Sequence, residues 1–75
     1  MILLRSKKEF EEKLIKLGYS KRKFAVKVNI SETALLQIIN GKQFPRPQTA
    51  KKICEGLDVN FDDVFTINEI KSQLS

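Results

Sequence analysis

The polar side chains of this chain are suited to hydrogen bonding and ion pairing rather than to covalent chemistry. The sequence contains no histidine and one cysteine, Cys54. No pair of carboxylates stands in a pattern typical of an active site, and no cluster of cysteine and histidine has metal-ligand spacing. We therefore expect no enzymatic activity, no metal and no cofactor. Cys54 falls on the apolar face of a predicted helix, where it is interpreted as a small buried hydrophobe.

The basic residues are concentrated in the middle of the chain, although the net charge of the whole is only +5. Residues 13–52 contain ten basic residues and one acid, Glu32, whereas residues 53–75 contain one base and five acids. A concentrated basic region is the electrostatic footprint of a polyanionic partner. A charge run alone is more often a solvated surface, so the helical pattern of the same region has to decide between the two.

Capping and stop signals divide the chain into five predicted helices. Ser6 with Glu9 matches a capping box at the start of the first helix, and Gly18 is suited to end it. Ser20 and Ser31 are predicted N-caps of the second and third helices. The predicted helices span residues 7–17, 21–28, 32–40, 47–57 and 61–65. No alternation typical of strands is found, so the predicted fold class is all-α, a compact five-helix domain.

The segment from Leu17 to Lys42 has the layout of a helix-turn-helix. Asn29 stands where a tight turn between the second and third helices requires a positive φ angle. A helical wheel separates the third helix into an apolar side with Leu35, Ile38 and Ile39, and an opposite side with Thr33, Leu36, Gln37 and Asn40. Because a helix-turn-helix places its second helix in the major groove, this pattern predicts double-stranded DNA as the partner.

Four segments, in order and spacing, resemble the Cro and phage-repressor type of helix-turn-helix proteins, often called Xre-like. They are YSKRKFA at the second helix, VNIS at the turn, LLQIINGK through the third helix, and LDVNFDDVF at the end. The resemblance runs from about Lys7 to Phe65 and implies a lambda-repressor-like DNA-binding domain with the helix-turn-helix at helices 2 and 3. At Lys21 this chain departs from many relatives, which have glutamine there. A cation at that position should strengthen the salt-dependent part of DNA binding.

The resemblance implies that the first turn and the middle of the third helix contact the edges of DNA bases. Carried over to this sequence, that nominates Glu32, Thr33 and Gln37. Gln37 can make a bidentate contact to adenine, Glu32 can accept from cytosine N4, and Thr33 can contact a thymine methyl. Two alternatives stay open: an ordinary exposed amide at Gln37, and a favourable interaction of Glu32 with the helix dipole.

A second set of residues is expected to contact the DNA backbone, which usually receives half or more of the hydrogen bonds in such an interface. The set is Ser20, Lys21, Ser31, Asn40, Lys42 and Arg46. The first three lie at helix starts, where unpaired N–H groups favour phosphate. The resemblance places Asn40 and Lys42 against the sugar-phosphate chain, and Arg46 follows in the loop. Asn40 also fits a purely structural role as a helix stop before Gly41.

The resemblance further implies a sequence-specific transcriptional regulator, in particular a Cro-like repressor that binds a palindromic operator as a homodimer. Proteins of this type dimerise through the region around helices 4 and 5. Val59, Phe61 and Phe65 are therefore candidates for a two-fold interface, although the two phenylalanines are most simply core residues. Little of the chain remains outside the domain to sense a ligand, so no small-molecule ligand is expected.

One domain is expected from a chain of 75 residues. We assign residues 1–66 to the helix-turn-helix domain and residues 67–75 to a C-terminal tail. No apolar run is long enough to span a bilayer, so no membrane partner is expected. A single cysteine fits a reducing compartment, which makes the cytoplasm the expected location.

An alternative function belongs to a different class: an antitoxin or other interaction protein that binds a protein partner and binds DNA only secondarily. Its docking residues would be Ile2, Leu3 and Leu4 together with the tail from Ile67 to Leu74. Within that tail Ile67, Ile70 and Leu74 have an amphipathic spacing. A regulator and an antitoxin differ in genomic position, beside a divergent promoter in the first case and directly after a toxin gene in the second.

Overall fold

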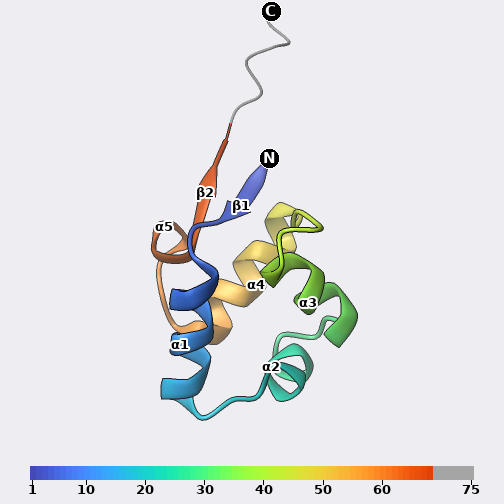
Figure 1. The fold of residues 1–75 in the computed structure, drawn as a ribbon, viewed down its shortest axis with the longest axis vertical. Helices are drawn as coiled ribbons and strands as arrows, with labels where there is room; N and C mark the ends of the chain where they lie inside the picture. Colours follow the sequence, from blue (N-terminus) through green and yellow to red (C-terminus); the bar gives the residue numbers. More distant parts are fainter. Residues whose placement is uncertain (69–75) are drawn as a thin grey trace, which may run out of the picture.

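The computed structural model describes residues 1–68, which form five helices and a two-stranded sheet. The helices are α1 (Lys7–Leu17), α2 (Lys21–Lys27), α3 (Glu32–Ile39), α4 (Pro47–Leu57) and α5 (Phe61–Val64). The strands are β1 (Ile2–Leu4) and β2 (Phe65–Ile67). The helices gather into one cluster, and the two strands project from it side by side (Figure 1). The prediction of a five-helix domain is confirmed.

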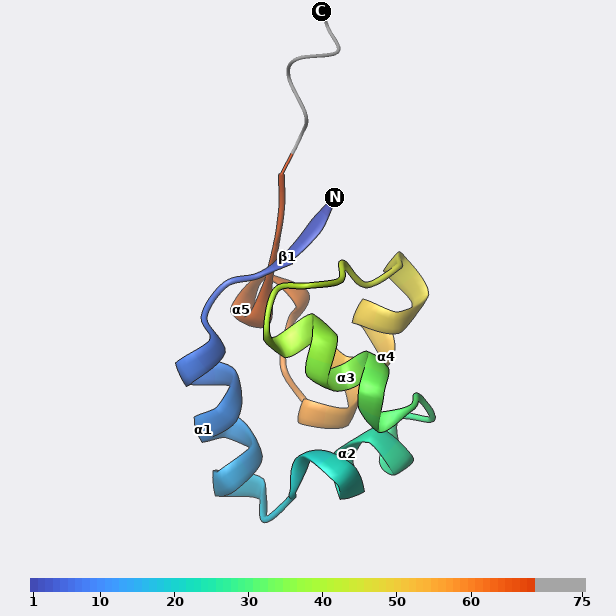
Figure 2. The same cartoon turned by 45° about the vertical axis from the view of Figure 1, so that its right-hand side comes forward.

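The helix ends lie where local signals in the sequence place them. Ser6, Ser20 and Ser31 each accept a hydrogen bond through Oγ from the N–H three residues further on, at 3.1, 3.1 and 3.0 Å. Gly18 ends α1 with a φ of 81°. Asn29 has a φ of 61° in the turn between α2 and α3, which lie next to each other (Figure 2). The predicted helix-turn-helix is therefore formed by α2, this turn and α3.

Some details of the helices differ from the prediction. α2 and α3 each end one residue earlier than expected, at Lys27 and Ile39. α5 ends at Val64 because Phe65 has an extended backbone, with φ −119° and ψ 160°. The helical spacing of Phe10, Leu14 and Leu17 predicts that all three lie on the buried face of the first helix. Phe10 and Leu14 are buried, but Leu17 is 47% exposed, since the contribution of α1 to the core ends at Leu14.

The two-stranded sheet was not expected from the sequence. β1 and β2 pair in antiparallel fashion, with Ile2 opposite Ile67 and Leu4 opposite Phe65. The Asn68 N–H continues the ladder by donating to the Met1 carbonyl oxygen at 2.9 Å. Strands of three residues are too short to show alternation, which is why the all-α prediction missed this small addition. The predicted boundary after Thr66 falls within β2.

Residues 69–75 lie outside the described part of the chain. Two members of the predicted amphipathic spacing, Ile70 and Leu74, belong to that segment. Of the tail residues named for partner docking, the structure thus describes only Ile67 and Asn68, and Ile67 is 66% exposed. At the other end of the chain, Ile2 and Leu4 of β1 are half-buried and pack against the core.

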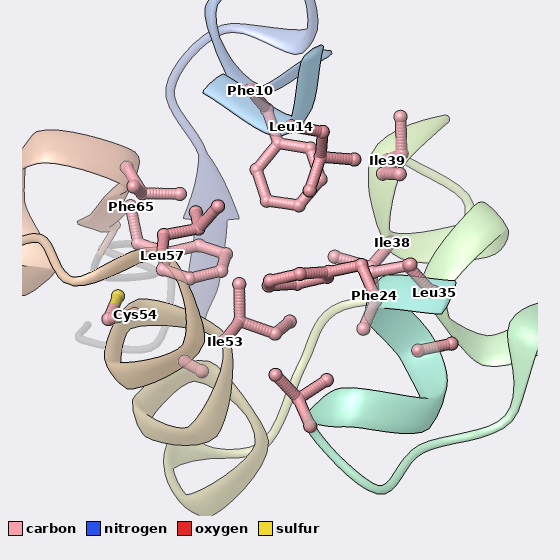
Figure 3. Packing of buried hydrophobic residues seen from close by; sticks show 14 residues of the cluster. Phe10, Leu14, Phe24, Leu35, Ile38, Ile39, Ile53, Cys54, Leu57 and Phe65 are labelled. Atoms are coloured by element: carbon pink, nitrogen blue, oxygen red, sulfur yellow. The ribbon is translucent and has the colours of Figure 1, made fainter. Parts of the chain in front are cut away.

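The core is built around Phe24 of α2, which is fully buried. Its ring points into the space between α1, α3 and α4 (Figure 3). It makes an edge contact with Phe10, with ring centroids 6.1 Å apart, and a similar one with Tyr19 at 5.8 Å. Leu35, Ile38 and Ile39 enter the same core from α3, each at most 3% exposed. The core therefore decides which face of α3 remains at the surface.

α4 brings both an apolar stripe and a glycine to the core. Ala50, Ile53, Cys54 and Leu57 are buried, as expected from their spacing. Burial raises the pKa of the Cys54 thiol, which fits its interpretation as a small hydrophobe. Gly56 allows α2 to approach closely, because a Cβ at this position would lie 2.5 Å from Val28 Cγ1.

Candidate nucleic-acid interface

α3 presents polar side chains opposite its buried face. Thr33 and Gln37 lie one turn apart and are exposed, and Glu32 is exposed at the N-terminal end of the helix. Leu36 is half-buried at the margin between the two faces. The Ser31 cap, in which Oγ accepts from the Ala34 N–H, holds the first turn of α3 in place. The three residues expected to contact bases are thus all accessible on one short, anchored helix.

The two serines expected at phosphates are both exposed N-caps. Ser20 begins α2 and Ser31 begins α3, and each uses its Oγ as a hydrogen-bond acceptor from the backbone. A hydroxyl that accepts in this way still has its own proton to donate. Each serine can therefore keep its helix cap and at the same time donate to a phosphate oxygen.

The loop after α3 folds back onto the last turn of that helix. The backbone N–H groups of Lys42 and Gln43 both donate to the Gln37 carbonyl oxygen, at 2.8 and 3.2 Å. Asn40, also exposed, ends α3 with its N–H on the Leu36 carbonyl oxygen at 2.9 Å. The backbone bonds to Gln37 hold Lys42 close to the polar face of α3. Arg46 follows at the far end of the loop, exposed and directly before Pro47.

Lys21 differs from the other backbone candidates because it is already paired within the protein. Its Nζ lies 2.7 Å from Glu11 Oε2, so the first residue of α2 is joined to the middle of α1. The hydrogen bond from Lys21 is the main cause of a lowered pKa at Glu11. Sequence reasoning missed this pair, because its members stand on different helices and no local spacing connects them.

Charge is distributed unevenly over the fold. No charged residue is buried in the described part of the chain. The basic residues of the chain's middle lie on α1, α2, the loop after α3 and the first half of α4. Acidic residues gather at the end of α4 and on α5: Glu55, Asp58, Asp62 and Asp63. The basic residues thus lie on α2 and on the segments around the helix-turn-helix, whereas α3 itself has one acid, Glu32, and no base. α5 belongs to an acidic region.

Residues 1–68 contain neither a cluster of metal-ligating side chains nor a membrane-spanning helix. No group of three or more His, Cys, Asp or Glu side chains is placed there to hold a metal ion. None of the helices described in this range is long and apolar enough to cross a membrane.

A five-helix domain with an exposed polar face on the second helix of a helix-turn-helix is the architecture of a DNA-binding protein. Comparison with protein families agrees, since the family model described as helix-turn-helix, of the Cro/C1 type, matches residues 10–64. The chain belongs to this family and is a DNA-binding transcription regulator. Its family consists of DNA-binding regulators that are generally not enzymes. A search of curated proteins finds no match to the chain.

Proposed function

We propose that the protein is a Cro-like repressor that binds a palindromic operator as a homodimer in the cytoplasm. The observation that carries this proposal is the polar face of α3, where Thr33 and Gln37 are exposed opposite a fully apolar buried face. In the proposed complex this face lies in the major groove, with Gln37 bidentate to an adenine. Glu32 and Thr33 contact bases from the first turn of the helix.

The phosphate contacts are proposed from residues around that face. They are Ser20, Lys21, Ser31, Asn40, Lys42 and Arg46. Five of them are exposed and Lys21 is half-buried. They stand at the starts of α2 and α3, at the end of α3 and along the loop that follows it. Cations at phosphates release counterions, so we expect the DNA affinity to fall steeply as salt rises.

The proposed dimer surface is an apolar groove on the side of the molecule formed by α4, α5 and the strands. It has a volume of about 770 Å³. Val59 and Phe61, two of the residues expected at a two-fold interface, line it. The apolar groove is also lined by Met1, Ile2, Phe44, Pro45, Pro47, Cys54 and Ile67. Phe65 does not line this groove. It is fully buried and its ring packs against that of Phe61, with ring centroids 5.5 Å apart.

A second copy of the chain is the occupant that we propose for the apolar groove. Met1, Phe44 and Ile67 at its edge are 44%, 46% and 66% exposed, a concentration of apolar surface typical of an interaction site. Lys51 and Glu55 also line it. In an isologous contact the same patch meets itself, so the lysine of one copy can face the glutamate of the other. Repression then needs no further surface, because an operator-bound dimer blocks a promoter.

The test is selection of bound sequences from a random duplex DNA pool at physiological salt. We expect an inverted repeat with half-sites about one helical turn apart. Replacement of Gln37 by alanine should relax the preference at one base pair of each half-site, at a cost of about 1–3 kcal/mol in discrimination. Binding competition with single-base operator variants measures this loss.

Gln48→Ala is a matched control, since Gln48 is an exposed glutamine on α4 rather than α3. It should leave the sequence preference unchanged. A Gln37→Ala protein that keeps the full preference at every position would remove Gln37 from the base contacts. A pool without any enriched sequence would contradict the repressor proposal as a whole.

The alternative function, an antitoxin, draws support from the same apolar groove, because a toxin could occupy it instead of a second copy. Of the three β1 residues named for such docking, Ile2 lines this groove, whereas Leu3 and Leu4 do not. Gene order and copurification distinguish the antitoxin from the repressor. A gene that directly follows a toxin gene, and a protein that copurifies with that toxin as a stoichiometric complex, would favour the antitoxin.

A further inference from the structure

We infer that Glu11 sets the DNA affinity of this protein by competing with phosphate for Lys21. The inference rests on the proposed DNA-binding face and deepens it, since it concerns how one contact of that face is regulated. It assigns a role in binding to a residue of α1, outside the helix-turn-helix itself.

The geometry supports a direct competition. Glu11 Oε2 and Lys21 Nζ are 2.7 Å apart, and the two side chains are 33% and 37% exposed. Lys21 is thus reachable by a phosphate while it is held by a carboxylate of its own chain. Within residues 1–68, no other basic side chain has a carboxylate partner within 4.0 Å. Lys21 is therefore distinguished from Lys42 and Arg46, which meet phosphate without a competitor.

Electrostatic repulsion determines that Glu11 weakens, rather than strengthens, the contact of Lys21 with phosphate. A phosphate oxygen that hydrogen-bonds Lys21 Nζ comes to about 2.8 Å from that nitrogen. It then lies within about 6 Å of the Glu11 carboxylate, where two negative charges repel each other even close to water. Glu11 either gives up its bond to Lys21 or remains beside the phosphate at this cost. In both cases the carboxylate weakens the contact.

Competition by Glu11 also changes how the DNA affinity depends on salt. When Lys21 binds a phosphate, the DNA releases a counterion. If Lys21 leaves Glu11 at the same time, the freed carboxylate attracts a cation from solution and offsets part of that release. Neutralising Glu11 should therefore make the dependence of affinity on salt steeper. Because phosphates are the same at every base pair, the gain in affinity should be equal for operator and non-operator DNA.

The experiment compares the full-length protein with its Glu11→Gln variant. The probes are a mixed-sequence duplex and the operator selected as described above. We expect Glu11→Gln to bind both duplexes about two- to fivefold more tightly, the range that an exposed ion pair allows. The slope of log affinity against log salt should become steeper by up to about 0.9, the value for one added phosphate contact.

Two further proteins separate this mechanism from others. Glu12→Gln removes the same charge from the neighbouring, exposed position, and should change affinity and slope much less. In a Lys21→Met background, Glu11→Gln should have no effect beyond that of Glu12→Gln. A double-mutant cycle of this kind isolates the coupling between the two side chains. Thermal melting of every variant checks that the compared proteins are folded.

Several results would overturn the inference. Equal gains from Glu11→Gln and Glu12→Gln would mean that only net charge matters. Weaker binding by Glu11→Gln would mean that Glu11 orients Lys21 toward the phosphate instead of competing for it. An unchanged affinity, with normal binding by the wild-type protein, would remove this inference and leave the proposed function standing. A wild-type protein that binds neither duplex would end both.

Discussion

At the scale of single residues, Gly56 shows how packing overrides local preference. Alanine is favoured over glycine inside a helix by about 1 kcal/mol, yet α4 has a glycine in its last turn. The neighbours explain it: a Cβ would lie 2.5 Å from Val28 Cγ1 and 3.1 Å from Phe24 Cε1. Both neighbours belong to the α2 end of the core, so the glycine keeps α2 and α4 in contact.

Gly56→Ala is therefore expected to destabilise the protein. Overpacking typically costs about 1–3 kcal/mol, and the gain in helix propensity recovers only part of it. We expect the free energy of unfolding to fall by about 1–2 kcal/mol in urea denaturation. Val28→Ala in the same protein should relieve the clash, so the double variant should lose less than the sum of the single losses. A single variant as stable as the wild type would show that α2 moves away at no cost.

A positive φ angle, by contrast, can be predicted from a local sequence pattern. Asn29, with a φ of 61°, was expected in this conformation because the turn of a helix-turn-helix requires it. Asp58 adopts a φ of 58° at the end of α4, where glycine is more usual. A local pattern thus predicts such an angle well when a motif surrounds it.

At the scale of elements, α3 depends on its surroundings. A helix of eight residues is too short to be stable alone in water. Its first turn is capped by Ser31, its apolar face is buried in the core that includes Phe24, and its end is tied to the following loop through the Gln37 carbonyl oxygen. The orientation of Gln37 and Thr33 toward a partner therefore follows from these three attachments.

Substitutions of Ser31 should separate the cap from the proposed phosphate contact. Ser31→Ala loses the cap and should lower the free energy of unfolding by about 1 kcal/mol. Ser31→Asp keeps a good capping side chain, so stability should remain near that of the wild type. The added carboxylate repels phosphate, and DNA affinity should fall at least severalfold. Thermal melting and a DNA titration measure the two effects.

Ser6→Asp is the matched control, because Ser6 caps α1 through the equivalent Oγ hydrogen bond but lies outside the helix-turn-helix. It should reduce DNA affinity less than Ser31→Asp does. If the two aspartates had equal effects on affinity, the start of α3 would not be close to a phosphate.

At the scale of the whole molecule, the two surfaces that we propose for binding are formed by different elements of one core. The helix-turn-helix is proposed to bind DNA, and the apolar groove beside the acidic α5 is proposed to bind a second copy of the chain. β1 and β2 contribute to the groove through Ile2 and Ile67, which are paired across the sheet. The sheet thus joins the first and last described residues into the surface that we propose for dimerisation.

Ile67→Asp tests that surface. Ile67 is 66% exposed, so the change should leave the fold intact while placing a charge in the proposed interface. We expect the dimer to dissociate at least about tenfold more readily, because the contact would bury a charge without a partner, and operator affinity to fall with it. Sedimentation over a range of protein concentrations measures the change.

Val26→Asp serves as the comparison, because Val26 is 76% exposed on α2, outside the apolar groove. It should leave the oligomeric state unchanged. An Ile67→Asp protein that dimerises like the wild type would place the two-fold interface elsewhere.

Features that depend on a few neighbouring residues were predictable from the sequence. The caps at Ser20 and Ser31, the stop at Gly18 and the turn at Asn29 all lie where local hydrogen bonding and backbone preference place them. The separation of α3 into a buried and an exposed face followed from its helical periodicity, and with it the accessibility of Thr33 and Gln37. The resemblance to a known family then linked these elements to DNA.

Features that join distant parts of the chain came only from the tertiary structure. The pairing of Ile2 with Ile67 and the ion pair of Glu11 with Lys21 each depend on segments that meet only when the core closes. The contact of Gly56 with Val28 has the same origin. Helix ends follow from short-range hydrogen bonds, which the sequence displays directly. Packing neighbours depend on how complete helices fit together, which no local pattern records.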